Sequence, residues 1–138
     1  MSVAKRFIDP SISVYVLSSD PRFSRRALAV LEDAENGVYE AYTSTLVVSQ
    51  VLAHLERRGR SKAMHLFLEY LEDSPIIVVE TRLEDYTRAL EEARVHGLPF
   101  HSLWDDLVIV VQVERLGIRE IYSNDRDFDR IPGVVRLF

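Results

Sequence analysis

Acidic side chains occur at three separated places in the sequence from which they could converge on a cation. Asp9 ends a short apolar segment, and Asp105 and Asp106 precede a long apolar run. Asp125 and Asp127 follow a second short apolar segment. Carboxylates that converge repel one another unless a cation lies between them. Oxygen ligands of this kind suit Mg²⁺ or Mn²⁺, and such a cation can activate water for attack on a phosphate.

Each of these acids also has an ordinary structural explanation. Asp105 or Asp106 could cap a helix and suit its dipole, and Asp9 before Pro10 could open a turn. Acids that alternate with arginine, as over residues 124–130, are common in solvated turns. The order of the three places along the chain, rather than any one of them, favours a shared site.

Short apolar segments alternate with segments of helical periodicity along the chain, without a linker or a repeat. Strands are predicted at 6–9, 38–43, 75–79, 121–122 and 134–138. Helices are predicted from Asp20-Pro21 to Asn36, from Ser44 or Thr45 to Arg58, and over 61–71 and 83–96. This alternation indicates an α/β fold, with a mainly parallel sheet covered by helices. Ligands bind such sheets at the carboxyl ends of the strands, where Asp9 and Asp125 are expected.

The run from Leu107 to Val111 is ambiguous, because its β-branched residues also favour a strand. The apolar pattern continues through Leu116 and stops at Gly117, which gives the length and the ending of a helix. We therefore expect a buried helix that begins next to Asp105 and Asp106.

Length and composition restrict the class of protein. A chain of 138 residues suits a single domain, residues 1–138. The absence of cysteine excludes disulfides and thiolate metal sites. No signal peptide or membrane-spanning run is evident, so a cytoplasmic protein without a membrane partner is expected. The net charge of −5 argues against binding nucleic acid through charge alone, but not against an enzyme that uses a cation.

Four segments in chain order resemble the sequence blocks of the PIN-domain family. Phe7-Ile8-Asp9-Pro10-Ser11 resembles the opening strand and its acid, and residues 42–52 resemble the block in which a helix carries an acid. Trp104-Asp105-Asp106-Leu107 is similar to the third block, and Tyr122-Ser123-Asn124-Asp125 to the fourth. The resemblance implies a three-layer α/β/α fold with a mainly parallel sheet. It also implies an Mg²⁺- or Mn²⁺-dependent ribonuclease.

The resemblance assigns roles to individual residues. Asp9, Asp106 and Asp125 match the family's catalytic, metal-binding acids, and Asp106 is preferred to Asp105 for its spacing from Gly117. Asp127 is a possible additional metal ligand. Ser11 and Ser123 match the hydroxyl residues that support the acids.

Gln50 stands where the family usually has a glutamate, so this chain departs from the pattern. An amide oxygen can bind a metal but brings neither charge nor a base, and affinity for hard cations follows ligand charge. Gln50 is compatible with a weaker enzyme, a protein that has lost catalysis, or an engineered substitution. On residue type alone it is a polar residue at a helix edge, at i±4 spacing from Leu46 and His54.

The resemblance also suggests partners, because many small members are VapC-like toxins. An RNA substrate, an antitoxin protein and a homodimer are therefore expected. Arg22 and Arg25, in one basic cluster, and Arg57 and Arg58, in another, could contact RNA phosphates. The alternative for such clusters is a solvated helix end.

Two other functions stay open. The first is a catalytically weakened PIN-fold module that binds RNA or a protein, which would account for Gln50. The second is a structural or interaction domain without a nucleic-acid role, which the negative charge favours. Binding to phosphates leaves a salt dependence that the second alternative lacks.

Overall fold

Five parallel strands form the centre of the computed structural model, which describes residues 3–138. In spatial order they are β3 (Ile77–Val79), β2 (Glu40–Ser44), β1 (Lys5–Ile8), β4 (Glu120–Tyr122) and β5 (Val135–Leu137). β1 pairs with β2 on one side and with β4 on the other, so the chain reverses its direction of winding there. Such a reversal opens a crevice at the carboxyl ends of the central strands.

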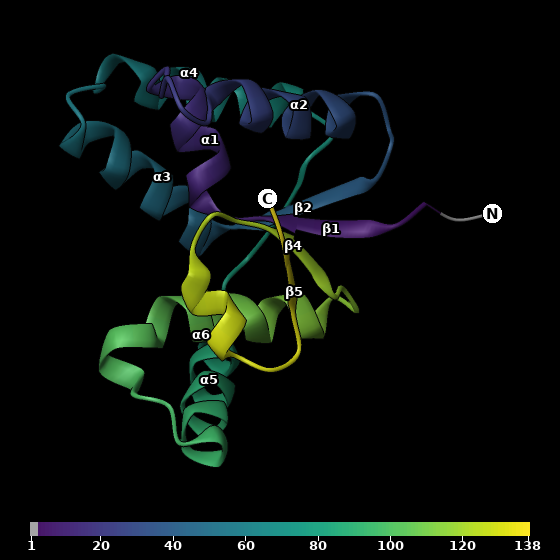
Figure 1. Ribbon diagram of the computed structural model, residues 1–138, viewed down its shortest axis with the longest axis vertical. Helices are drawn as coiled ribbons and strands as arrows, with labels where there is room; N and C mark the ends of the chain where they lie inside the picture. Colours follow the sequence, from purple (N-terminus) through teal and green to yellow (C-terminus); the bar gives the residue numbers. More distant parts are fainter. Residues whose placement is uncertain (1–2) are drawn as a thin grey trace.

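Helices cover both faces of the sheet (Figure 1). One layer holds α1 (Pro10–Leu17), α2 (Ser24–Glu35), α3 (Thr45–Arg57) and α4 (Lys62–Asp73). The other layer holds α5 (Leu83–His96), α6 (Phe100–Arg115) and the short 3₁₀ helix η1 (Arg126–Arg130). The predicted α/β class, with three layers and a parallel sheet, is confirmed.

The core lies on both sides of β1, because neighbouring residues of a strand point to opposite faces. Phe7 packs in the cluster that includes Leu107 and Val111 of α6, whereas Ile8 packs with Ile12 and Leu31 of the other layer. Phe7 is fully buried and Ile8 nearly so, which anchors the strand that leads into Asp9. The position of the first acid is thus fixed by apolar packing on two faces.

The ambiguous apolar run is a helix, as predicted, but the helix begins at Phe100, so Asp105 and Asp106 lie inside it and not at its start. α6 extends from Phe100 to Arg115, and every residue from Leu107 to Val113 is buried. A helix segment that is apolar on nearly all sides belongs in the interior. Phe7 of β1 and Ile121 of β4 share a core cluster with it, and α5 packs on it as well. Its apolar character serves this core, and no helix of residues 3–138 is both long and apolar enough to cross a bilayer.

Three sequence predictions need correction. A helix follows directly after Asp9-Pro10, where only a turn was considered, and Asp9 caps it with Pro10 in its first turn. The helix expected from Asp20-Pro21 begins instead at Ser24, because the Asp20 carboxylate accepts hydrogen bonds from the next backbone N–H groups and forms a turn. The strand at 75–79, expected to be buried, is a three-residue edge strand with Ile77 41% exposed.

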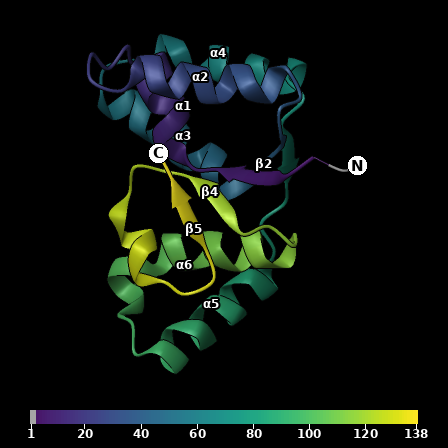
Figure 2. The ribbon, with the colours of Figure 1, turned by 45° about the vertical axis from the view of Figure 1, so that its right-hand side comes forward.

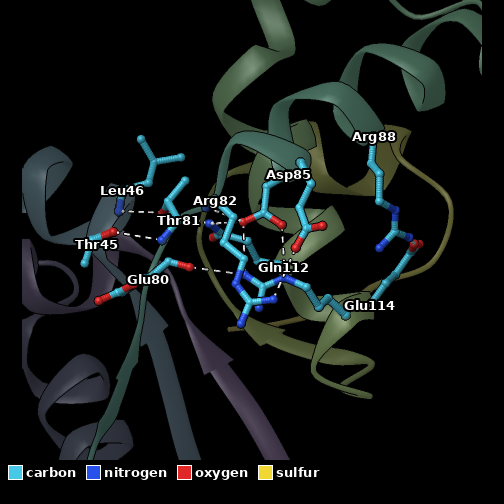
Figure 3. Close-up of polar contacts among 11 residues, drawn as sticks. Thr45, Leu46, Glu80, Thr81, Arg82, Asp85, Arg88, Gln112 and Glu114 are labelled. Carbon is cyan, nitrogen blue, oxygen red and sulfur yellow. Dashed lines mark hydrogen bonds and ion pairs between the residues drawn. The ribbon is translucent and has the colours of Figure 1, made fainter.

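A polar cluster joins the two helical layers beyond the end of β3 (Figure 3). Thr81 accepts hydrogen bonds from the Leu46 N–H of α3, at 3.1 Å, and from the Gln112 amide of α6, at 2.7 Å. Asp85 of α5 is fully buried and binds the Arg115 guanidinium through two hydrogen bonds of 3.0 Å. This cluster fixes α3 relative to α6.

Loss of the Asp85 charge should destabilise the protein strongly. Asp85→Asn leaves Arg115 without its buried partner, which typically costs about 3–5 kcal/mol. On the same helix, Glu91→Gln breaks an exposed pair with Arg94 and should cost at most about 1 kcal/mol. Urea unfolding of both variants measures the difference in stability. Equal losses of stability would contradict the structural role of the buried Asp85–Arg115 pair.

The same pair predicts a pH dependence. Burial alone would raise the pKa of Asp85, but hydrogen bonds from Arg115, the Arg82 backbone and Gln112 outweigh burial and lower it. A lowered pKa stabilises the fold above the unfolded value of about 3.9, and this contribution is lost as the pH falls below it. Unfolding followed from pH 6 to pH 3 should show a larger loss of stability in the wild type than in Asp85→Asn, which keeps the contributions of Asp20, Glu91 and Asp129.

Candidate functional site

Asp9 lies at the carboxyl end of β1, held by two serine side chains. Its carboxylate accepts the Ser11 N–H at 2.9 Å and the Ser11 hydroxyl at 2.6 Å. Its second oxygen accepts a short hydrogen bond from the Ser123 hydroxyl, which comes from the loop after β4. Asp9 is only 3% exposed. The structure thus places both predicted supporting serines against the first acid.

The loop after β4 is built from successive hydrogen bonds of the same kind. The Asp125 N–H donates to the Ser123 hydroxyl at 2.9 Å, and the Asp125 carboxylate caps η1 by accepting the Asp127 N–H at 2.9 Å. The Asn124 N–H donates to the Ser11 hydroxyl at 3.2 Å. The loops that follow β1 and β4 are therefore tied together, and they hold Asp125 beside Asp9.

α6 brings the third group of acids to the same end of the sheet. Asp106 is 6% exposed, and one oxygen from each of Asp106, Asp125 and Asp127 lies within 4.8 Å of the others. Asp105 is turned toward α3, where its carboxylate accepts the Gln50 side-chain amide at 2.9 Å. Figure 2 shows α1 and α3 above this end of the sheet and α6 below it.

Burial and mutual repulsion raise the pKa values of the inner acids. Burial raises the pKa of Asp9 to about 6, although hydrogen bonds from Ser11 and Ser123 oppose the shift. The pKa of Asp106 is raised well above its ordinary value by burial and then by the nearby Asp125 and Asp105 carboxylates. Full ionisation of this group is unfavourable without a compensating positive charge.

The donors at the site fit a hard divalent cation. Asp106, Asp125 and Asp127 supply carboxylate oxygens at a spacing that one ion could bridge, and Asp9 stands beside them. The Gln50 side-chain oxygen is buried and has no hydrogen-bond partner among the described residues. Carboxylate and amide oxygens are the ligands that Mg²⁺ and Mn²⁺ accept.

Asp9, Gln50, Asp106 and Asp125 line one cleft of about 230 Å³, whereas Asp127 is not among its lining residues. Tyr15, His54 and Asn124 also line the cleft, although the sequence analysis gives them no role there. Asp105, the less favoured of the two adjacent acids, lines it as well. Of the four arginines predicted to contact RNA, Arg58 lines the cleft, whereas Arg22 does not line it and pairs with Asp20. Arg25 and Arg57 are exposed and do not line it.

Comparison with known proteins gives both a family and a fold. A family model of the PIN domain matches residues 6–134. VapC20 of Mycobacterium tuberculosis, a sarcin-ricin loop cleaving toxin, has a similar structure with a TM-score of 0.77 at 18% identity; the match covers 94% of this chain and 96% of VapC20. A VapBC complex from Salmonella typhimurium, solved bound to DNA, gives 0.68 at 15% identity and covers 98% of each chain.

A toxin–antitoxin complex from Klebsiella pneumoniae is also similar, with a TM-score of 0.64 at 16% identity, over 94% of this chain and 95% of that one. At such identities the likeness establishes the shared fold and leaves activity to other arguments. No curated protein sequence is similar enough to be matched with this chain.

Removal of one inner acid should stabilise the metal-free protein. An acid whose pKa is raised by folding makes the folded state less stable as the pH rises above the unfolded value of about 4. Asp106→Asn removes this effect, so the metal-free variant should be more stable than the wild type at pH 8, by about 0.5–2 kcal/mol. Thermal unfolding in a chelator at pH 5 and pH 8 tests this.

The control is Asp129→Asn, which removes an exposed carboxylate outside the cleft that pairs with Arg136. It should not stabilise the protein at pH 8. An Asp106→Asn protein that is less stable than the wild type at pH 8 would contradict the repulsion described here.

Proposed function

The chain belongs to the PIN domain family, and from this premise we propose that it is an endoribonuclease that hydrolyses RNA phosphodiester bonds with Mg²⁺ or Mn²⁺. The observation that carries the proposal is the convergence of Asp9, Asp106 and Asp125 in one cleft, from two loops and a helix. Each is held by burial or by hydrogen bonds, as catalytic groups require.

In this proposal Asp9, Asp106 and Asp125 hold the cation, and Asp127 is an additional ligand. A divalent cation bound there would lower the pKa of a water molecule and offset the charge that develops on the phosphate. Ser11 and Ser123 keep the Asp9 carboxylate in one orientation, since they donate to both of its oxygens. A cation held there would also offset the repulsion from Asp125 and Asp105 that, after burial, raises the pKa of Asp106.

Gln50 brings one negative charge fewer to the site than a glutamate would, but it still supplies a polar side chain there. Its amide N–H donates to Asp105, and its oxygen is buried without a hydrogen-bond partner among the described residues. We infer that this oxygen accepts a hydrogen bond from a water molecule or joins the cation as a neutral ligand. A second candidate function, a weakened PIN-fold module that binds RNA or a protein, is favoured by this one position.

We further propose that the protein acts in the cytoplasm as the toxin of a toxin–antitoxin pair, inhibited by a protein partner. The support is that several structures of the same fold were solved as VapBC or toxin–antitoxin complexes. A homodimer is part of the same proposal, and its mass can be measured by light scattering in solution.

Cleavage of labelled single-stranded RNA of mixed sequence tests the activity. With Mg²⁺ or Mn²⁺ the wild type should cleave, and Asp9→Asn and Asp125→Asn should lose at least about a hundredfold in rate, since each removes a charged metal ligand. Gln50→Glu should cleave faster and bind Mn²⁺ more tightly, as followed by electron paramagnetic resonance.

Asp129→Asn is the matched control, because it removes an exposed acid from the same stretch of chain. If Gln50→Glu alone cleaves, the chain is an inactive nuclease and the second candidate function replaces the first. Cleavage that persists in Asp9→Asn and Asp125→Asn, or in a chelator, would refute the proposed site.

A further inference from the structure

We propose that Arg58, backed by the ring of Tyr15, forms a subsite that binds an RNA phosphate next to the bond being cleaved. The subsite lies in the same cleft as the acids, toward α3 and α1. The inference rests on the proposed function and adds to it the way in which the substrate is held. Its ligand is the phosphodiester of a single-stranded nucleotide chain.

The electrostatics of the cleft require such a group. Four carboxylates line it, and among the lining residues within the described chain Arg58 supplies the permanent positive charge. His54 also lines the cleft, but burial and the charges of Arg57 and Arg58 lower its pKa, which favours its neutral form. The Arg58 guanidinium is therefore the group of this lining that can attract a nucleic-acid phosphate through a fixed positive charge.

Protein contacts position the Arg58 guanidinium but leave most of its N–H donors without a partner within residues 3–138. It lies 3.4 Å from the Ser18 hydroxyl and 3.7 Å from the Asp20 carboxylate, which are long distances for such pairs. It stands over the Tyr15 ring at 6.0 Å from the centroid, and its side chain is 43% exposed. A guanidinium has five N–H donors, so most remain available for a bidentate phosphate contact.

Tyr15 connects this subsite to the acids. Its hydroxyl accepts the Asn124 side-chain amide at 2.9 Å, and Asn124 directly precedes Asp125. Phe23 packs against the ring from another side, with 4.8 Å between centroids. The ring is thus held between the loop after β4 and Arg58, where it can form a wall for the sugar or base of the bound nucleotide.

The neighbouring arginine provides a natural control. Arg57 is the last residue of α3 and Arg58 caps the helix end. Arg57 is exposed, contacts His54 at 3.5 Å and does not line the cleft. The two side chains have the same charge and the same long-range attraction for RNA. A difference between their variants therefore reports the position of the guanidinium and not net charge.

Binding of a fluorescent single-stranded RNA of mixed sequence, measured by anisotropy at several salt concentrations, tests the subsite. All proteins carry Asp125→Asn to prevent cleavage and are compared in Mg²⁺. Arg58→Ala should weaken binding and reduce the slope of log K against log salt by about 0.7, the value for one phosphate contact on a single strand. Arg57→Ala should leave the slope unchanged, and Arg58→Lys should retain it with weaker binding.

Thermal unfolding of each variant separates binding from folding, and Arg58→Lys keeps the test valid if Arg58→Ala unfolds. In the cleavage-competent chain, Arg58→Ala should raise KM more than it lowers kcat, and Arg57→Ala should change neither. Equal salt slopes for Arg57→Ala and Arg58→Ala, with RNA still bound, would overturn the subsite but leave the proposed nuclease intact. Absence of any salt-dependent RNA binding would overturn both.

Discussion

Repulsion between carboxylates that share a poorly solvated cleft is the constraint on which this molecule depends. Asp9 and Asp106 are both buried, and each raises the free energy of the other's ionised form. The fold resists this repulsion through hydrogen bonds to Asp9 and through apolar packing below it. Such strain at a site is stable only when the surrounding structure overdetermines it. A bound cation turns the same arrangement into an attractive one.

The two walls of the cleft belong to different helical layers. Contacts outside the cleft must therefore fix the distance between them. Gln50 belongs to α3 in one layer, whereas Asp105 and Asp106 belong to α6 in the other. Thr81 binds both helices, since it accepts one hydrogen bond from the start of α3 and one from Gln112 of α6. The 2.9 Å contact between Gln50 and Asp105 therefore depends on a residue of the loop between β3 and α5.

Periodicity predicted the long elements well, because each has a clear apolar face and a recognisable end. The helix from Leu83 to His96 was placed correctly, with its left-handed cap at Gly97. The sequence analysis predicts a helix at Asp20-Pro21 and only a turn at Asp9-Pro10, whereas the structure has the reverse. The local sequence is the same in both, and packing of the following residues decides between a helix and a turn. Short strands such as Ile77–Val79 carry too few residues to show which face is covered.

The acids could be predicted as a set because the carboxyl ends of parallel strands meet at one edge. What the sequence could not provide is the direction of each side chain. Arg57 and Arg58 are adjacent and chemically identical, yet the turn of α3 sends only the second into the cleft. Tyr15 was missed for a related reason, since α1 itself was not predicted and nothing local indicates that its hydroxyl meets Asn124.

The hydrogen bond between Asp9 and Ser123 joins two residues that are 114 positions apart, so they leave the ribosome at different times. A ribosome makes the amino end first, and early segments fold before later ones emerge. β1 can pair with β2 early, but its other partner, β4, and the loop that holds Asp125 come from the last fifth of the sequence. The nascent chain therefore lacks a complete set of acids until the loop after β4 has been made. Any activity that depends on this set appears only after that loop has left the ribosome and packed against β1.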